Sequence, residues 1–199
     1  MTRAALQRPY IIGITGGIGS GKSVASHLLR LMDVPVYDCD SEAKRLMHES
    51  PIVRKALIEE IGEKVYDAYG KLNRAYMAAY MFGNPEHVAR VNAIVHPAVR
   101  ADFKEWSQHS RHSVVAVESA ILYEAHMEDD VDSVWLVHAP EALRLQRATQ
   151  RDKADEEAIK RRMQSQMSEQ ELLQRADKVV YNDGSRSLIG QLWQLLSNM

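Results

Sequence analysis

Apolar residues along the chain follow two alternating patterns. Short, nearly continuous apolar runs are typical of strands that are covered on both faces in a parallel sheet. These runs lie at 10–14, 34–38, 114–117, 134–137 and 178–181. Between them, apolar positions recur at helical spacing, as they do in 22–32, 141–175 and 188–196. The alternation predicts a doubly wound α/β fold, a five-stranded parallel sheet with right-handed crossovers.

Residues 52–110 contain no convincing strand. Their apolar positions recur at helical spacing, and Tyr69-Gly-Lys-Leu-Asn73 and Asn84-Pro85 punctuate them. We therefore expect one domain over residues 1–199 that carries a helical subdomain at 50–110 on one side of the sheet. The helical region 141–175 is a candidate for a mobile lid.

The segment GGIGSGKS at residues 16–23 fits the phosphate-binding pattern G-x-x-x-x-G-K-S/T. It follows a predicted strand and opens a predicted helix, so that backbone N–H groups and the helix N-terminus can point at phosphate oxygens. In this motif Lys22 reaches the β- and γ-phosphates and the Ser23 hydroxyl coordinates Mg²⁺. A flexible connector is the alternative, but a connector has no need of Lys-Ser at a helix entrance.

Two carboxylates, Asp38 and Asp40, follow the second predicted strand, at the edge where open parallel sheets bind ligands. Phosphoryl transfer needs a group that orients the hydroxyl and accepts its proton, and charge that holds Mg²⁺. N-capping of the next helix is the alternative for Asp40. For Asp38 the alternative is a solvated strand end, and Cys39 between them is more typical of buried filler.

Glu118 ends the third predicted strand, where an acid can bind Mg²⁺ directly or through water, although a hydrogen-bonded surface acid fits equally well. Arg147 and Arg151 are four residues apart and share one helix face, on which they could together meet an anion. The alternative for them is a solvated, charged helix. His96-Pro97 is more typical of a helix kink than of a base.

Composition narrows the function classes. The chain has 25 Lys+Arg against 27 Asp+Glu, which argues against a protein built around sequence-independent nucleic-acid binding. The single cysteine excludes an internal disulfide framework and favours the cytoplasm. No apolar stretch is long enough for a membrane span, and the histidines show no metal-ligand pattern.

Several further segments, taken together, resemble one family, the dephospho-CoA kinases, from about Tyr10 to the last helix. The similar blocks are TGGIGSGKS (15–23), VYDCD (36–40), GKLNR (70–74), IVHPAVR (94–100), ILYE (121–124), QRATQRD (146–152), KRRMQSQ (160–166) and ADKVVYND (176–183). The resemblance implies a P-loop NTPase fold of the nucleoside-monophosphate-kinase type. It also implies transfer of the γ-phosphoryl group of ATP to the ribose 3′-hydroxyl of dephospho-CoA with Mg²⁺, the last step of coenzyme A synthesis.

The resemblance also implies roles for individual residues. The ATP-binding set is Gly17, Ile18, Gly19, Ser20, Gly21, Lys22, Ser23, Val24 and Asn182, with Asn182 near adenine. Asp40 is the implied base, with Asp38 in support, and Arg147 and Arg151 are the implied lid residues over the transferring phosphoryl group. Asn73, Arg74 and His96 are implied at the acceptor, and Ser23 and Glu118 at the metal.

This sequence departs from the family pattern at three positions. Val24 stands where the family often has Thr, Ala120 replaces a Pro, and Lys44 replaces an Arg, which loses the planar fork of hydrogen-bond donors. Another small-molecule or nucleoside kinase stays open as an alternative, because the same loop, lid and acid serve many acceptors. A regulatory GTPase is disfavoured because N-K-x-D is absent. We expect small-molecule partners and a monomer or small homo-oligomer.

Overall fold

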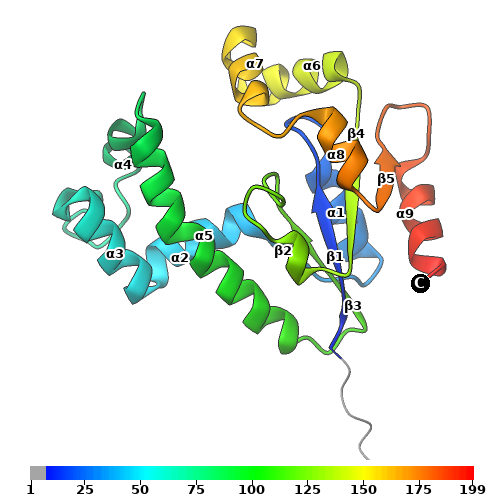
Figure 1. Ribbon diagram of the computed structural model, residues 1–199, viewed down its shortest axis with the longest axis horizontal. Coiled ribbons are helices and arrows are strands. Elements are labelled where there is room, and N and C mark those ends of the chain that lie inside the picture. The colour runs from blue at the N-terminus through cyan, green and yellow to red at the C-terminus, as the bar shows by residue number, and fades with distance from the viewer. Residues whose placement is uncertain (1–7) are drawn as a thin grey trace, which may run out of the picture. The chain divides into compact units, whose positions relative to one another are not determined.

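A five-stranded parallel sheet forms the centre of the first of two structural units in the computed structural model (Figure 1). The structure describes residues 8–199. The strands are β1 (Tyr10–Thr15), β2 (Val36–Asp38), β3 (Val114–Glu118), β4 (Ser133–His138) and β5 (Lys178–Tyr181). Their order is β2-β3-β1-β4-β5, so β1 lies in the middle and pairs in parallel with both β3 and β4.

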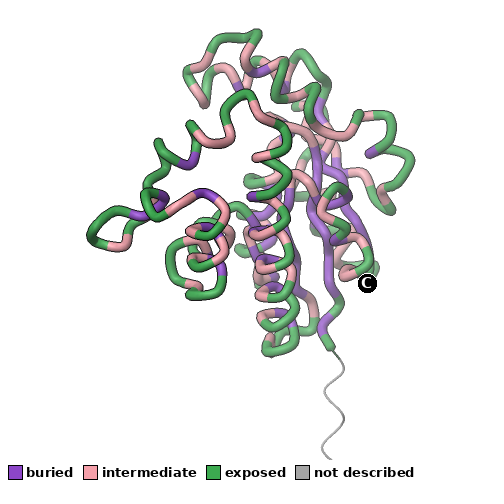
Figure 2. Tube along the Cα trace, turned by 60° about the vertical axis from the view of Figure 1, so that its left-hand side comes forward, coloured by how far each residue is buried: buried purple, intermediate pink, exposed green. Residues whose placement is uncertain are grey.

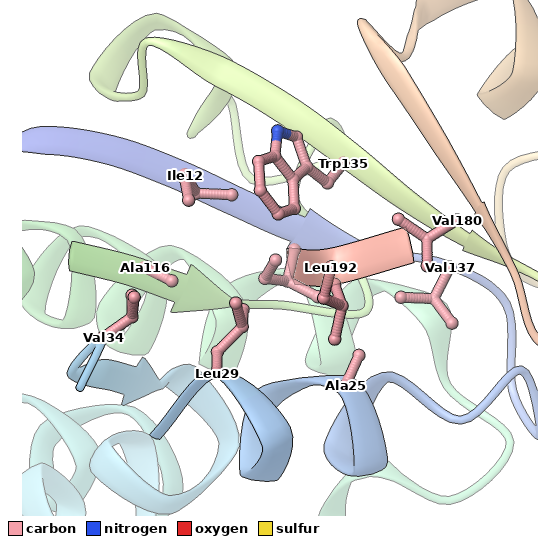
Figure 3. Packing of buried hydrophobic residues seen from close by; sticks show 10 residues of the cluster. Ile12, Ala25, Leu29, Val34, Ala116, Trp135, Val137, Val180 and Leu192 are labelled. Atoms are coloured by element: carbon pink, nitrogen blue, oxygen red, sulfur yellow. The ribbon is translucent and has the colours of Figure 1, made fainter. Parts of the chain in front are cut away.

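One face of this sheet packs against helices α1 (Lys22–Leu31) and α9 (Leu188–Ser197) (Figure 3). Alternate residues of the strands, such as Ile12 and Trp135, point to this face and contact Leu29 and Leu192 of the two helices. The alternation follows from the two-residue period of a strand, and the burial of these side chains is the main source of stability in this unit.

The opposite face of the sheet packs against irregular chain. A Cβ atom on Gly13 of β1 would lie 2.7 Å from Leu122 Cδ1 and 3.2 Å from Val131 Cγ2. Glycine therefore lets the segment after β3 approach the sheet. Figure 2 shows the strands as mostly buried stretches of the chain.

Three further helices of the first unit follow β4. They are α6 (Glu141–Asp152), α7 (Glu156–Gln164) and α8 (Glu169–Arg175), and a 3₁₀ turn, η2 (Glu128–Asp130), precedes β4. Helix α8 begins with a capping box, in which the Ser168 side chain accepts a bond from the Glu171 N–H and Glu171 accepts one from the Ser168 N–H. These helices correspond to the predicted lid region, and their mobility stays a prediction.

The second unit, Asp38–Trp106, is helical. It contains α2 (Cys39–Glu49), α3 (Pro51–Ile61), the turn η1 (Glu63–Val65), α4 (Arg74–Met81) and most of α5 (Pro85–Gln108). Side-chain caps begin several of them: Ser50 caps α3 and Asn73 caps α4. Pro97 lies inside α5, next to His96.

The predicted strands and helices agree with these elements, and the predicted fold class is confirmed. Several boundaries differ. Strand β2 begins at Val36, after Pro35, because proline has no N–H to contribute to a sheet. The helical unit includes α2 and therefore begins before residue 50. Within residues 8–199, no helix combines the length and apolarity that crossing a bilayer requires.

Candidate active site

The loop between β1 and α1 has a backbone that side chains would obstruct. Gly19 and Gly21 have φ values of 78° and 95°, in the left-handed region that favours glycine. A Cβ on Gly19 would lie 2.1 Å from the carbonyl oxygen of Arg144, and one on Gly21 would lie 2.1 Å from Asn182 Nδ2. The chain therefore closes around a loop of bare backbone, the geometry that lets N–H groups approach an anion.

Helix α1 begins at this loop without a side-chain cap. Gly21 occupies its N-cap position and makes no side-chain cap bond, and the first turn holds no acidic residue. Uncapped N–H groups together with the helix dipole favour a bound anion. Val24, which follows in the first turn, is 54% exposed.

Lys22 adds a positive charge at the same place. Its ammonium group donates to the carbonyl oxygens of Gly16 at 2.6 Å and Gly17 at 3.2 Å. The side chain thus folds back over the start of the loop. This is the position from which a P-loop lysine meets the terminal phosphates.

Ser23 and Glu118 come together, as a metal site requires. The Ser23 hydroxyl donates to Glu118 Oε1 at 3.0 Å, and Glu118 is only 8% exposed. The strand register explains this contact, because β3 pairs with β1 so that Glu118 lies beside Ile14, just before the loop. A hydroxyl and a carboxylate are oxygen ligands of the kind that Mg²⁺ prefers.

Within residues 8–199, no cluster of three or more His, Cys, Asp or Glu residues could hold a metal ion. Mg²⁺ at Ser23 and Glu118 would not need such a cluster, because Mg²⁺ keeps several waters and takes few protein ligands when substrate phosphates bind it. The metal role of the two residues stays a prediction.

Asn182 connects the end of β5 to the loop. Its side-chain amide donates to the Ser20 carbonyl at 2.8 Å, and Arg147 Nη1 donates to the Asn182 carbonyl at 3.0 Å. Two predicted site residues, Asn182 and Arg147, therefore lie together beside the Ser20–Gly21 end of the loop.

Arg151 lies differently from Arg147, although both belong to α6. Its guanidinium donates from Nε to Asp152 Oδ1 at 2.7 Å, and its side chain is 61% exposed. Bonds from Arg151 and then Arg162 lower the pKa of Asp152 to about 2. The shared helix face that the spacing predicts does not by itself bring Arg151 to the loop.

Two residues of the first unit, Gln166 and Arg144, contact the phosphate loop although the sequence predicted no role for them. Gln166 Oε1 accepts from the Ile18 N–H at 2.9 Å, and the Arg144 guanidinium lies against Gly17. Arg144 stands three residues before Arg147 and seven before Arg151, so helical spacing could have placed it on the same stripe. Gln166 lies in the loop between α7 and α8, where no periodicity gives a signal.

In the second unit, Asp38 caps α2. Its carboxylate accepts from the N–H groups of Asp40 at 3.0 Å and Ser41 at 3.3 Å, and also from the Ser41 hydroxyl. The N-capping that we weighed for Asp40 therefore belongs to Asp38, and Asp40 is an exposed residue of the first turn. Cys39 is buried, as expected.

A cavity of about 560 Å³ lies within the second unit. Its lining joins basic side chains to thioether and aliphatic ones: Lys44, Met47, His48, Lys71, Leu72, Arg74, Met77, Ala78 and Met81. Of the predicted acceptor residues, Arg74 lines this cavity, whereas Asn73 caps α4 by accepting from the Tyr76 N–H. His96 lies on α5, and burial lowers its pKa.

Comparisons with known proteins agree on one family. A family model described as dephospho-CoA kinase matches residues 10–187. A dephospho-CoA kinase of Bacteroides fragilis is 46% identical over 187 residues, which cover 94% of this chain and 91% of that protein. The dephospho-CoA kinase of Porphyromonas gingivalis is 42% identical over 189 residues, which cover 94% of this chain and 93% of that protein.

Solved structures show the same fold. The crystal structure of TT1252 from Thermus thermophilus aligns with a TM-score of 0.84 at 33% identity, over 97% of this chain and 99% of that one. A shikimate kinase from Acinetobacter baumannii in complex with shikimate aligns with a TM-score of 0.53 at 19% identity, over 96% and 92%. The second likeness concerns the fold alone.

Proposed function

The chain belongs to the dephospho-CoA kinase family, and we propose that it transfers the γ-phosphoryl group of ATP to the ribose 3′-hydroxyl of dephospho-CoA. The products are CoA and ADP, in the last step of coenzyme A synthesis. The observation that carries the choice of acceptor is the family match over residues 10–187, since the loop alone serves many acceptors.

The loop residues bind the triphosphate. Backbone N–H groups within Gly17–Ser23 and the start of α1 surround the phosphate oxygens, except those of Ile18 and Ser20, which donate to Gln166 Oε1 and the Gly17 carbonyl. Lys22 adds a cation at the terminal end. Asn182, at the Ser20 carbonyl, lies on the side where the nucleoside is expected. The fixed positions of these donors mean that little reorganisation is needed when charge develops on the transferring group.

Ser23 and Glu118 would hold Mg²⁺, which when bound neutralises charge on the β- and γ-phosphate oxygens. Their 3.0 Å contact supports this assignment, because two oxygen ligands are already adjacent. Glu118 is also buried, so that its carboxylate is protected from bulk water.

Asp40 is the proposed base. The 3′-oxygen of the acceptor forms a bond to the γ-phosphorus, the bond to the β–γ bridging oxygen breaks, and the hydroxyl proton passes to the Asp40 carboxylate. Within its own unit Asp40 is exposed and its side chain has no hydrogen-bond partner among the described residues. Asp38 supports it by fixing the first turn of α2.

The cavity of the second unit suits the remainder of dephospho-CoA, which carries a diphosphate and a long neutral chain. Lys44, Lys71 and Arg74 supply positive charge for the diphosphate, and Met47, Met77 and Met81 offer adaptable apolar contact for the chain. Arg147 and Arg151 of the lid complete the proposed site, and the buried single cysteine fits a reducing compartment such as the cytoplasm.

An acceptor panel tests this function. Purified protein with ATP and Mg²⁺ is incubated with dephospho-CoA or with nucleosides, and CoA and ADP are quantified by chromatography. We expect turnover of dephospho-CoA, and an Arg74→Ala variant should raise the KM for dephospho-CoA while the KM for ATP stays constant. Lys55→Ala, which removes an exposed charge outside the cavity, is the control. Turnover of nucleosides without turnover of dephospho-CoA would refute the acceptor assignment.

A further inference from the structure

Arg144 is a buried arginine whose side chain lies against the phosphate loop. It belongs to α6 and is 8% exposed. A Cβ atom on Gly17 would lie 2.1 Å from Arg144 Nη1, and a Cβ on Gly19 would meet the carbonyl oxygen of the same residue. Both the side chain and the backbone of Arg144 thus touch the loop, and the three atoms nearest to a Cβ on Gly17 or on Gly19 all belong to Arg144.

Two of the three guanidinium nitrogens are held by the protein. Nε donates to the Ala139 carbonyl at 3.0 Å, and Nη2 donates to Glu169 Oε2 at 3.2 Å. The other oxygen of Glu169 lies 2.7 Å from His138 Nδ1. Because the guanidinium group is planar, these two bonds also fix the direction of the third nitrogen, Nη1.

Nη1 is therefore directed at Gly17 of the loop, and it has no hydrogen-bond acceptor within residues 8–199. Arg144 and Gly17 also line a cavity of about 340 Å³, to which His138, Lys160 and Glu169 contribute. A directed N–H donor beside bare loop backbone and open space is the arrangement that a phosphate oxygen would use.

Gly17 lies at the end of the loop where the terminal phosphates of the nucleotide are expected. Lys22, which in this motif reaches the β- and γ-phosphates, donates to the Gly16 and Gly17 carbonyls. Asn182 contacts the other end, at Ser20. Two cationic side chains, Lys22 from α1 and Arg144 from the lid, therefore converge on one glycine.

We propose that Arg144 is a triphosphate-binding residue: its Nη1 donates to the terminal phosphate of the bound nucleotide, and Glu169 and the Ala139 carbonyl hold it in that direction. This inference rests on the proposed function only in taking a nucleoside triphosphate as the phosphoryl donor. Glu169 offsets much of the positive charge of Arg144, so Arg144 contributes to nucleotide affinity chiefly through a directed hydrogen bond. Because ADP lacks the terminal phosphate that accepts this bond, Arg144 favours ATP over ADP.

Nucleotide binding tests the proposal without turnover. Calorimetry compares a non-hydrolysable β,γ-methylene ATP analogue with ADP in the wild type, Arg144→Ala and Arg144→Lys. A hydrogen bond to a charged group corresponds to about 10-fold or more in affinity. We expect Arg144→Ala to weaken binding of the triphosphate analogue by roughly that factor and binding of ADP by less than about 3-fold. Arg144→Lys should lie in between.

Arg161→Ala is the matched control, since it removes an exposed arginine from α7 that does not touch the loop. It should leave both affinities within about 2-fold of the wild type, as surface charges contribute little. Equal losses of triphosphate and ADP in Arg144→Ala, or no loss, would overturn the proposal and leave Arg144 a packing residue.

A pair of glycine variants tests the contact itself. Gly17→Ala places a methyl group against the Arg144 guanidinium, whereas Gly19→Ala places one against the residue 144 carbonyl. The nucleotide-free midpoint of thermal unfolding should fall in both, and adding Arg144→Ala should restore at least half of the loss for Gly17→Ala and none for Gly19→Ala. Rescue of neither variant would contradict the assigned contact.

These outcomes are independent of the acceptor. If the protein binds the triphosphate in an Arg144-dependent way but does not phosphorylate dephospho-CoA, the inference holds and the acceptor assignment falls. If it phosphorylates dephospho-CoA with unchanged nucleotide discrimination in Arg144→Ala, the inference falls and the proposed function holds.

Discussion

The β1–α1 and β2–α2 junctions are both strand-to-helix turns, yet they satisfy their backbone groups in opposite ways. Helix α1 starts at Gly21 with no side-chain cap and no acid in its first turn. Helix α2 starts at Asp38, whose carboxylate accepts two of its N–H groups, and its first turn holds Asp40 and Glu42. The first junction leaves donors for an external anion, whereas the second satisfies its donors internally.

This difference divides the proposed chemistry between the junctions. The start of α1 can bind phosphate because its N-cap residue is glycine, which has no side chain to accept from the first N–H groups. At the capped start, Asp38 does the capping, which releases the Asp40 carboxylate from that task. Neighbouring aspartates can thus serve different purposes, one in stability and one in catalysis.

The largest expected effect is at Asp40. Asp40→Asn removes the proton acceptor at constant size and should lower kcat by about 10²–10⁴-fold, the range for general bases, with little change in the unfolding midpoint. Steady-state kinetics measures it. Glu86→Gln, which removes another exposed acid from the first turn of a helix in the same unit, is the control. If Asp40→Asn kept the kcat of the wild type, Asp40 would not be the base, and the separate roles proposed for Asp38 and Asp40 would be wrong.

Lys22→Ala examines the uncapped junction. Loss of the cation that stabilises charge on the phosphates should lower kcat/KM by about 10²–10³-fold. Circular dichroism should show the fold retained, because Lys22 lies at the start of α1, outside the buried core of the sheet. Activity close to that of the wild type would mean that this junction does not hold the triphosphate.

Asp38→Ala tests the capped junction through stability. Loss of an N-cap costs about 1 kcal/mol, which for a protein of this size lowers the unfolding midpoint by about 2–4 °C. Asp38→Ser keeps a capping oxygen and should recover most of the stability. Thermal unfolding measures both variants. A large fall in kcat with an unchanged midpoint would instead assign Asp38 a direct role in catalysis.

The smallest expected effect concerns another capped start, the capping box of α8. Bonds from the Ser168 hydroxyl and then its N–H lower the pKa of Glu171. The ionised carboxylate therefore stabilises the fold above its unfolded pKa of about 4.3, and this stabilisation is lost as the pH falls through the lower folded pKa.

Glu171→Gln keeps an N3 acceptor but does not titrate. The difference in unfolding midpoint between the wild type and this variant should therefore shrink between about pH 5 and pH 3, which thermal unfolding in a pH series measures. A difference that stays constant over this range would show that the capping box does not depend on ionised Glu171.

The sequence predicted the five strands, the phosphate loop and the helical region because each depends on local patterns. Apolar runs, glycines and helical periods are readable within a few residues of one another. Glu118 was also predictable as a metal ligand from its place at a strand end. Its contact with Ser23, however, depends on the pairing of β3 with β1, two segments far apart in the chain.

Side-chain assignments in the lid show where local reading fails. The spacing of Arg147 and Arg151 predicts a shared face, yet Arg151 pairs with Asp152 while Arg144, which had no predicted role, lies against Gly17. The hydrogen-bond partners that decide where these arginines lie belong to other elements. Glu169 on α8 orients Arg144, and the Asn182 carbonyl after β5 accepts from Arg147.

The sequence by itself determined the kind of fold, the phosphate-binding loop and the family, because glycine conformation, strand and helix periods and ordered motifs are properties of contiguous residues. Only the tertiary structure decided which charges meet which loop atoms. Those contacts depend on strand order and on how the helices of the first unit pack, which bring together residues more than a hundred positions apart, such as Gly17 and Arg144.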